Sequence, residues 1–305
     1  MDMKTEHYAK SEPFGIYVHV PFCLSKCPYC DFYSVPYQEQ TVLQYCKAAQ
    51  RAIACAPQAG RRADSVYFGG GTPTSLSPED LDRLITKLKG TFDFSAVQEF
   101  TVEAGRPDSI TREKLEVLKK HGVGRISINP QTMKQDTLRL IGRRHTVEDV
   151  VDRFKLAREV GFDNINMDLI IGLPEETLED VQATMEAVKA LAPDSVTVHS
   201  LAIKRAARLN TMKEVYKDLK IENTQEMIDL TARYAREMGL EPYYLYRQKN
   251  MAGNFENVGY AAPGKACIYN VLIMEEQQTI IGCGAGTTTK RLFAEENRIE
   301  RCENV

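Results

Sequence analysis

The strongest constraint on the fold is an alternation of strand-like and helix-like stretches between residues 15 and 201. Short apolar runs of strand length alternate about six times with longer stretches whose apolar residues recur at helical spacing. This alternation is typical of parallel βα units joined by right-handed crossovers. Because a closed barrel of this kind has eight units, the pattern predicts an α/β fold built as a partial barrel. An open doubly wound sheet is the alternative.

The expected elements follow one another along the chain. Strands are predicted at residues 15–20, 64–68, 99–103, 125–129, 164–171 and 195–201. Helices are predicted at residues 38–57, 77–89, 111–122, 134–141, 147–160 and 178–191. Beyond residue 210 we expect a helix at 222–238, a strand at 241–246 and a strand hairpin formed by residues 266–274 and 279–281. Three parts are therefore expected: a polar N-terminal tail (1–13), the barrel (14–209) and a small C-terminal α+β extension (210–305) that packs on it.

Composition and charge exclude several classes of protein. The chain is 43% hydrophobic and 27% charged, as ordinary globular proteins are. A net charge of −3, with only short basic clusters such as Arg61-Arg62, gives no reason to expect a nucleic-acid partner. We find no apolar run long enough to span a membrane and no signal-peptide core in residues 1–13. We therefore expect a cytoplasmic protein with reduced thiols.

The chemistry-bearing motif is a C-x3-C-x2-C cluster of Cys23, Cys27 and Cys30, placed directly after the first predicted strand. A loop at that position lies at the carboxyl edge of a parallel βα array, where active sites form. Thiolates select soft metals, and three of them leave a four-iron cluster with one open position. We interpret the motif as a [4Fe-4S] site with an open iron. The alternative is a structural zinc completed by His19 or a distant cysteine, although a second C-x2-C is missing.

The other cysteines are interpreted as small buried residues. They are Cys46, Cys55, Cys267, Cys283 and Cys302.

These motifs resemble those of the radical S-adenosylmethionine (SAM) superfamily, in which an aromatic residue, here Tyr29, precedes the last cysteine. Residues 17–23 are similar to the oxygen-independent coproporphyrinogen III oxidase group, which includes HemN, the haem chaperone HemW and HemZ-like proteins. Further matches cover residues 69–74, 166–174 and 282–286, and residues 101–108 and 243–254 look most like HemZ. The resemblance implies a partial (β/α)6 TIM-like barrel, with a [4Fe-4S] cluster and SAM as cofactors.

The resemblance also implies a role for individual residues. The three motif cysteines would hold the cluster. The residues implied to bind SAM are Tyr17, Gly70, Gly71 and Thr72 near its methionine part, Glu103 at its ribose or amino group, Gln131, Arg143 at its carboxylate and Asp168 at its adenosine ribose. From the residues alone, plainer explanations stay open. The glycines could form an ordinary strand-end turn, Glu103 could be a solvated acid, and Arg143 could be a cation at a helix end. Asp168 could form a salt bridge, and Tyr17 could pack in the core.

By resemblance the protein is a radical SAM oxidoreductase of porphyrin and haem biosynthesis. It would decarboxylate the propionates of coproporphyrinogen III through a 5′-deoxyadenosyl radical, with electrons from a donor such as flavodoxin or ferredoxin. Candidate propionate contacts are Arg106, Arg144, Lys204, Arg205, Arg208 and Arg247. The alternatives are a haem chaperone or carrier of the HemW type, or another tetrapyrrole-modifying enzyme. Candidate haem ligands for the carrier are His145, His199, Tyr244 and Cys267.

Several positions depart from the family pattern. Asp31-Phe32 follows Cys30, where coproporphyrinogen oxidases carry a further cysteine, and this favours the carrier interpretation. Asn129-Pro130 replaces a glycine-valine pair, and residues 103–107 read Glu-Ala-Gly-Arg-Pro rather than Glu-x-Asp-Pro. The family's C-terminal helical domain is not found before Val305, so we interpret the chain as the core of a longer protein.

Overall fold

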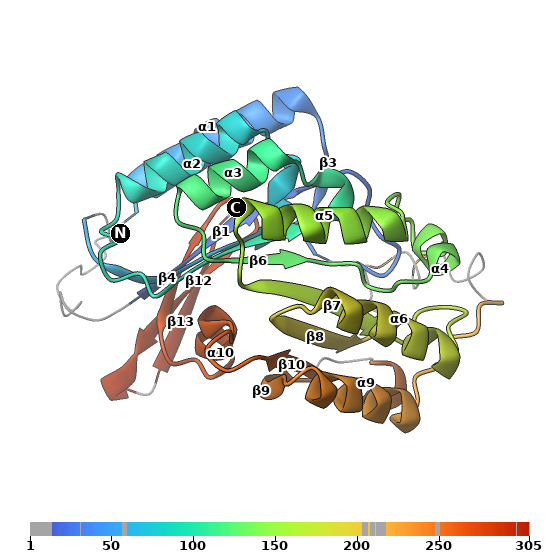
Figure 1. Ribbon diagram of the computed structural model, residues 1–305. Helices are drawn as coiled ribbons and strands as arrows, with labels where there is room; N and C mark the ends of the chain where they lie inside the picture. Colours follow the sequence, from blue (N-terminus) through green and yellow to red (C-terminus); the bar gives the residue numbers. More distant parts are fainter. Residues whose placement is uncertain are drawn as a thin grey trace.

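The computed structural model describes residues 14–30, 32–56, 60–202, 207, 211, 218–247, 251–296 and 298–304. Its centre is one curved sheet of eleven strands, whose outer face is covered by helices (Figure 1). The strand order is β13-β12-β11-β1-β4-β5-β6-β7-β8-β10-β9. The pairing order leaves β9 and β13 as the two edges, so the sheet described here is an open barrel.

The middle of the sheet is parallel and contains the six strands expected from the sequence. They are β1 (Phe14–Val20), β4 (Ala63–Gly70), β5 (Glu99–Gly105), β6 (Arg125–Ile128), β7 (Ile165–Ile171) and β8 (Ser195–Ser200). Their side chains are almost all buried, as expected for strands covered on both faces. The predicted partial (β/α)6 barrel is confirmed.

Helices cover the outer face of the sheet (Figure 1). They are α1 (Glu39–Ala54), α2 (Pro78–Lys89), α3 (Arg112–Lys120), α4 (Gln135–Leu140), α5 (Val147–Val160), α6 (Leu178–Leu191) and α9 (Gln225–Glu237). The side chain of Ser77 accepts a hydrogen bond from the Asp80 backbone N–H and so caps α2. Thr146 and Asp149 form a capping box at the start of α5, which ends at Gly161 with a φ of 98°. No described helix is long and apolar enough to cross a membrane.

The C-terminal extension completes the sheet at both edges. The antiparallel strands β10 (Asn257–Ala261) and β9 (Glu241–Tyr246) continue it beyond β8. On the opposite side, β11 (Thr279–Cys283) pairs in parallel with β1. The antiparallel strands β12 (Thr288–Phe293) and β13 (Arg298–Glu303) follow it. The domain boundary at residues 209 and 210 stays a prediction, while the sheet itself runs through both parts.

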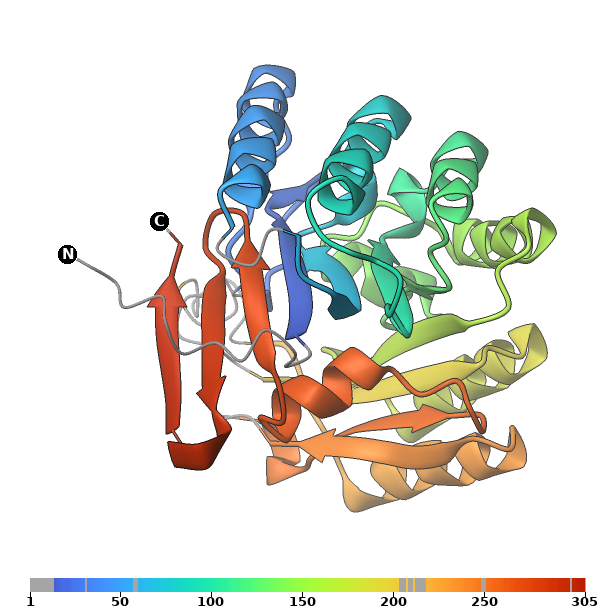
Figure 2. The same cartoon turned by 90° about the vertical axis from the view of Figure 1, so that its left-hand side faces the viewer.

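One predicted element of the extension is wrong. Residues 266–274, expected as a strand, contain the helix α10 (Ile268–Met274), which lies between the two groups of C-terminal strands (Figure 2). Its short run of apolar residues suits a strand or a buried helix equally well. The tertiary structure decides, because the buried carboxylate of Glu99 accepts hydrogen bonds from the backbone N–H groups of Ile268 and Tyr269 at 2.6 and 3.3 Å. These contacts satisfy donors that begin a helix.

Candidate active site

A cavity of about 340 Å³ lies inside the barrel, at the carboxyl ends of the parallel strands. Every residue predicted to hold the cluster or SAM lines it: Tyr17, Cys23, Cys27, Cys30, Gly70, Gly71, Thr72, Glu103, Gln131, Arg143 and Asp168. A larger hollow of about 920 Å³ lies on the outer side of the cysteine loop and shares Cys23, Ser25, Lys26, Ser34 and Arg143 with the inner cavity. It contains none of the predicted acids, so the inner cavity is the candidate site.

The cysteine loop, residues 23–30, is held at its base by a short pair of parallel strands, β2 (Phe22–Cys23) and β3 (Val35–Pro36). Burial raises the pKa of Cys23, and it raises that of Cys30 to about 11. In the described part of the chain, no group of three or more His, Cys, Asp or Glu side chains can hold one metal ion. Three thiols that face one cavity without gathering at one point suit a cluster, in which each thiolate binds a different iron.

His19 does not fit the role of a fourth zinc ligand. Its Nε2 donates to the carbonyl oxygen of Tyr33 at 3.0 Å, and its Nδ1 accepts from the Tyr17 hydroxyl at 3.3 Å. Both ring nitrogens are therefore engaged by neighbours, and the side chain is 4% exposed. His19 is therefore not available as the fourth ligand of a structural zinc site.

The glycine turn after β4 passes directly over the end of β1. A Cβ atom on Gly71 would lie 2.7 Å from the carbonyl oxygen of Phe22, and one on Gly70 would lie 2.9 Å from that of Val20. Gly70 also has a φ of +111°, which side-chain-bearing residues rarely adopt. The absence of side chains brings the turn beside the cysteine loop, where the Thr72 hydroxyl lies 3.5 Å from Cys23 Sγ.

Two acids face the cavity from β5 and β7, the strands on either side of β6. The Glu103 carboxylate accepts a hydrogen bond of 2.6 Å from the Tyr67 hydroxyl, and burial raises the pKa of Glu103 to about 7. Asp168 accepts from the side-chain amide of Asn166 at 2.7 Å. The nearest cation candidate, His199 Nε2, is 4.0 Å from Asp168, and burial lowers the pKa of this histidine. The amide of Asn166 therefore orients the Asp168 carboxylate, which can still accept further hydrogen bonds from a ligand in the cavity.

Gln131 and Arg143 come from the turns after β6 and α4. Gln131 has a φ of 70°, and its buried Oε1 has no hydrogen-bond partner in the described residues. Strained backbone at a non-glycine residue is a mark of functional sites. Arg143 donates from Nη1 to the Asn129 carbonyl oxygen at 2.6 Å, while its buried Nε lacks a described partner. The cavity therefore presents a free donor and a free acceptor next to the cysteine loop.

Of the three predicted propionate contacts that the structure describes, only Arg106 lines this cavity. Arg106 lines it, but its guanidinium is bound to Asp108 and Ser25. Arg144 lines the outer hollow instead, and Arg247 is exposed in an ion pair with Glu256 at 3.2 Å. The predictions for Lys204, Arg205 and Arg208 lie outside the described residues, as does that for Asp31.

The four candidate haem ligands divide into two pairs. His199 and Tyr244 line the cavity. His145 and Cys267 do not: His145 is 1% exposed, and the buried Cys267 thiol bonds to Glu99 at 3.3 Å. Burial, which the sequence does not reveal at single residues, keeps both side chains out of the cavity. The expectation that all scattered cysteines are buried fails for Cys55 and Cys302, which are exposed.

Sequence reasoning named Tyr17 and Tyr244 singly but missed that tyrosines form an aromatic side of the cavity. Tyr17, Tyr67 and Tyr269 stack with ring centroids 4.4 to 6.1 Å apart. Tyr244 and Tyr246, on one face of β9, have nearly parallel rings 6.0 Å apart. The alternation of tyrosines over residues 243–246 is the signal that predicts a shared face, but it does not reveal which surface that face meets.

Comparison with known proteins gives the class. A model of the Radical SAM superfamily matches residues 17–188, more than half of the chain, and the chain therefore belongs to this superfamily. Its members use a [4Fe-4S] cluster and SAM, and these are the cofactors of this chain. The predicted resemblance is confirmed.

Within the superfamily, the chain is similar to proteins of the HemN, HemW and HemZ group. It is 43% identical over 306 residues to the oxygen-independent coproporphyrinogen-III oxidase-like protein HemZ of Bacillus subtilis, covering 97% of this chain and 61% of that protein. It is 39% identical over 191 residues to the heme chaperone HemW of the same species, covering 62% of this chain and 50% of that protein.

A solved structure is similar as well. Coproporphyrinogen III oxidase (HemN) from Escherichia coli, described as a radical SAM enzyme, superposes with a TM-score of 0.77 at 25% identity. The match covers 93% of this chain and 66% of that one. The chain thus spans between half and two thirds of the length of these three relatives.

Proposed function

We propose that this chain is a tetrapyrrole-directed radical SAM enzyme that removes carboxyl groups from the propionates of a coproporphyrinogen-like substrate. The observation that carries the proposal is the single cavity. It is lined by the cysteine loop, by Glu103 and Asp168, and by tyrosines of the barrel and of the C-terminal extension. The names of the HemZ and HemN relatives support the substrate class.

In this proposal Cys23, Cys27 and Cys30 would hold the cluster, and SAM would bind beside it. The SAM residues are those that line the cavity beside the loop: Tyr17, Gly70, Gly71, Thr72, Glu103, Gln131, Arg143 and Asp168. When bound, the cluster and SAM together supply one-electron chemistry that no amino-acid side chain provides. An external donor such as flavodoxin or ferredoxin supplies the electron.

The chain's own groups recognise the charges of SAM. The guanidinium of Arg143 offers its free Nε–H to the SAM carboxylate, and the free Oε1 of Gln131 accepts a hydrogen bond beside it. The carboxylate of Glu103 faces the ammonium or the ribose hydroxyls. Asp168, held by Asn166, accepts hydrogen bonds from the adenosine ribose. The pairings with Arg143 and Gln131 would satisfy buried polar atoms that have no partner among the described residues.

The substrate lies on the opposite side of the cavity. Tyr244 and Tyr246 line the cavity with nearly parallel rings that carry polar hydroxyls, which suits a macrocycle with polar substituents. Met274 and Asn270 line the same part of the cavity and add apolar area and a hydrogen-bonding amide. A macrocycle placed there has its substituents directed at the SAM site.

A haem chaperone of the HemW type is the second candidate. One observation favours it: His199 lines the cavity, and burial lowers its pKa, which keeps the imidazole in the neutral form that binds haem iron. The HemW relative supports the same function.

One assay separates these functions. The full chain is reconstituted with iron and sulfide without oxygen, reduced, and incubated with SAM and coproporphyrinogen III. We expect a brown protein with about four irons per chain and loss of two carboxyl groups from the substrate by mass spectrometry. Tight haem binding, seen as a Soret shift that His199→Ala removes, without decarboxylation, establishes the carrier instead. A colourless protein that binds only zinc overturns both.

A further inference from the structure

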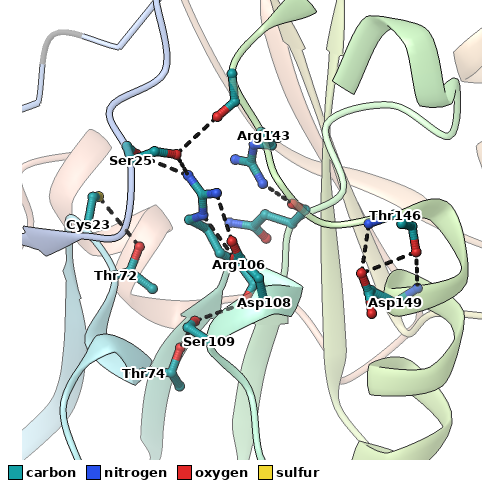
Figure 3. A network of polar contacts seen from close by, with 12 residues as sticks. Cys23, Ser25, Thr72, Thr74, Arg106, Asp108, Ser109, Arg143, Thr146 and Asp149 are labelled. Carbon is teal, nitrogen blue, oxygen red and sulfur yellow. Dashed lines mark hydrogen bonds and ion pairs between the residues drawn. The ribbon is translucent and has the colours of Figure 1, made fainter. Parts of the chain in front are cut away.

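Arg106, in the turn that follows β5, reaches across to the middle of the cysteine loop (Figure 3). Its Nη1 donates to the carbonyl oxygen of Ser25 at 3.0 Å and to the hydroxyl of Ser25 at 2.9 Å. Its Nε and Nη2 donate to the two carboxylate oxygens of Asp108 at 3.0 and 2.9 Å. The guanidinium is only 4% exposed, so these contacts form away from bulk water, where they are strongest.

The base of this arrangement is rigid. The Ser109 hydroxyl donates to the carbonyl oxygen of Arg106 at 2.8 Å and lies 2.6 Å from the Thr74 hydroxyl. Lys114 Nζ donates to the carbonyl oxygens of both Ser109 and Thr74, at 2.9 and 2.6 Å. Pro107 restricts the backbone directly after Arg106. The guanidinium therefore projects from a turn that cannot easily follow the loop if the loop moves.

Ser25 is also tied to a second turn. Its hydroxyl donates to the carbonyl oxygen of Gly142 at 3.0 Å, and the next residue, Arg143, is fixed to Asn129. Ser25 lies between Cys23 and Cys27 in the sequence, so its position sets how these two thiols are presented. The loop is thus bound at its centre from two sides, in addition to the strand pair at its base.

We propose that Arg106 is a positioning residue that clamps the cysteine loop in the geometry required by the cluster. Four of the N–H donors of one planar group are used at once, two on Asp108 and two on Ser25. A lysine keeps the charge but cannot reproduce this fork. Asp108 fixes the plane of the guanidinium and balances its charge. The proposal rests on the assignment of the cluster to Cys23, Cys27 and Cys30, and it replaces the sequence-based prediction that Arg106 binds substrate.

The test measures how fast the reconstituted protein loses iron to a chelator without oxygen. Arg106→Lys is expected to release iron about tenfold to a hundredfold faster, as loss of supporting contacts does at other metal sites. Ser25→Ala removes the hydroxyl contacts but keeps the carbonyl contact, so a smaller acceleration is expected. The electron paramagnetic resonance signal of the reduced cluster should also respond differently to SAM in Arg106→Lys, which a purely structural role elsewhere in the fold would not cause.

Arg158→Lys is the matched control. Arg158 likewise joins a carboxylate, that of Asp194 at 2.8 Å, to two backbone carbonyl oxygens, those of Phe162 and Ala192, at 3.1 and 3.0 Å. It does not line the cavity. We expect native iron release in this variant. Equal acceleration in Arg106→Lys and Arg158→Lys would show a general loss of stability and overturn the clamp.

The two proposals fail in different ways. If the native protein holds no cluster, the proposed function and the proposed clamp are both wrong. If the native protein holds the cluster and Arg106→Lys releases iron at the native rate, only the clamp fails. Should Arg106→Lys not fold, Asp108→Asn is measured instead. It keeps the contacts to Ser25 but loosens the guanidinium, and we expect a smaller acceleration; a native rate overturns the clamp.

Discussion

The two sides of the cavity are built in different ways. The polar wall consists of the cysteine loop, the glycine turn, Glu103, Gln131, Arg143 and Asp168. It is ordered by directional hydrogen bonds that join the cysteine loop to the turn after β5 and the turn after α4, and the turn after α4 to the turn after β6. The aromatic wall consists of Tyr17, Tyr67, Tyr244 and Tyr246, which line the cavity, together with Tyr269, which stacks on Tyr17 and Tyr67. It is ordered by ring stacking, between the barrel and the C-terminal extension at Tyr269 and within the extension at Tyr244 and Tyr246.

This difference bears on what each wall tolerates. A hydrogen bond is lost when an atom is removed or displaced by a fraction of its length, and an unpaired buried group is costly. Stacked rings depend mainly on buried area and keep most of their energy when a hydroxyl is lost. We therefore expect single-atom changes to be severe on the polar wall and mild on the aromatic wall.

Loss of a cluster ligand should have the largest effect. Cys27→Ala is expected to lower SAM cleavage to background and to reduce the bound iron sharply, because the proposed cluster keeps only two thiolates. Iron content and 5′-deoxyadenosine formation are measured together. The control is Cys55→Ala, because Cys55 is exposed on α1's C-terminal cap and does not line the cavity. Native iron content in Cys27→Ala would contradict the assignment.

A methyl group on the glycine turn should have the next largest effect. Gly71→Ala places a Cβ atom 2.7 Å from the Phe22 carbonyl oxygen, and because this neighbour is backbone, one of the two strands must move. We expect a stability loss of about 1–3 kcal/mol and a rate of SAM cleavage lower by roughly tenfold to a hundredfold.

Gly124→Ala is the matched control for this prediction, because a Cβ atom there meets no other atom within 4 Å. Thermal unfolding and SAM cleavage of both variants are compared with those of the native chain. Equal behaviour of the two variants would show that the close approach at Gly71 is unimportant.

The pH dependence of SAM binding should report Glu103. Burial raises the pKa of this group from 4.5 to about 7. Its neutral form therefore contributes stability that is fully present below about pH 4.5 and is lost as the pH rises through 7. A cationic ligand group needs the ionised form, so SAM binding should strengthen roughly tenfold between pH 6 and 8, as measured by titration calorimetry.

Glu103→Gln is expected to flatten this profile. Glu176→Gln is the matched control, because burial raises the pKa of Glu176 to about 7 as well, yet this residue bonds to Thr132 and does not line the cavity. A flat profile in the native protein, or the same change in both variants, would remove Glu103 from the SAM site.

The smallest effect is expected on the aromatic wall. Tyr246→Phe keeps the ring beside Tyr244 but removes the hydroxyl that lies 3.3 Å from His199 Nδ1. We expect tetrapyrrole affinity to fall by about fivefold or less, since one modest hydrogen bond is lost. Tyr246→Ala should cost more because it removes the stacking surface. A larger loss of tetrapyrrole affinity in Tyr246→Phe than in Tyr246→Ala would show that the hydroxyl matters more than the ring. It would contradict the expectation that single-atom changes are mild on the aromatic wall.

The polar wall was largely predictable from the sequence. Alternating strands and helices fix where each parallel strand ends, and the ends meet at one edge of a barrel. The resemblance pointed to Glu103 and Asp168, and that rule explains why strands that are apart in the sequence bring them to one cavity. The role of Arg106 did not follow, because the sequence does not show that a guanidinium near Asp108 also reaches Ser25, eighty-one positions earlier in the chain.

The aromatic wall and α10 were not predictable in the same way. The apolar run at residues 268–274 suits a strand or a helix, and Glu99 selects the helix only because the fold brings it to that point. Tyr17, Tyr67 and Tyr269 come from three distant parts of the chain. Nothing local in any of them indicates the other two.

The sequence by itself therefore determined the class of fold, the cysteine motif and the strand-end residues, because these depend on short-range spacing and on the geometry of parallel βα units. The tertiary structure alone decided the helix that lies between the C-terminal strands, the burial of His145 and Cys267, the stacked tyrosines and the clamp on Ser25. These features depend on contacts between residues far apart in the chain. Their energies exist only after the sheet has brought the partners together.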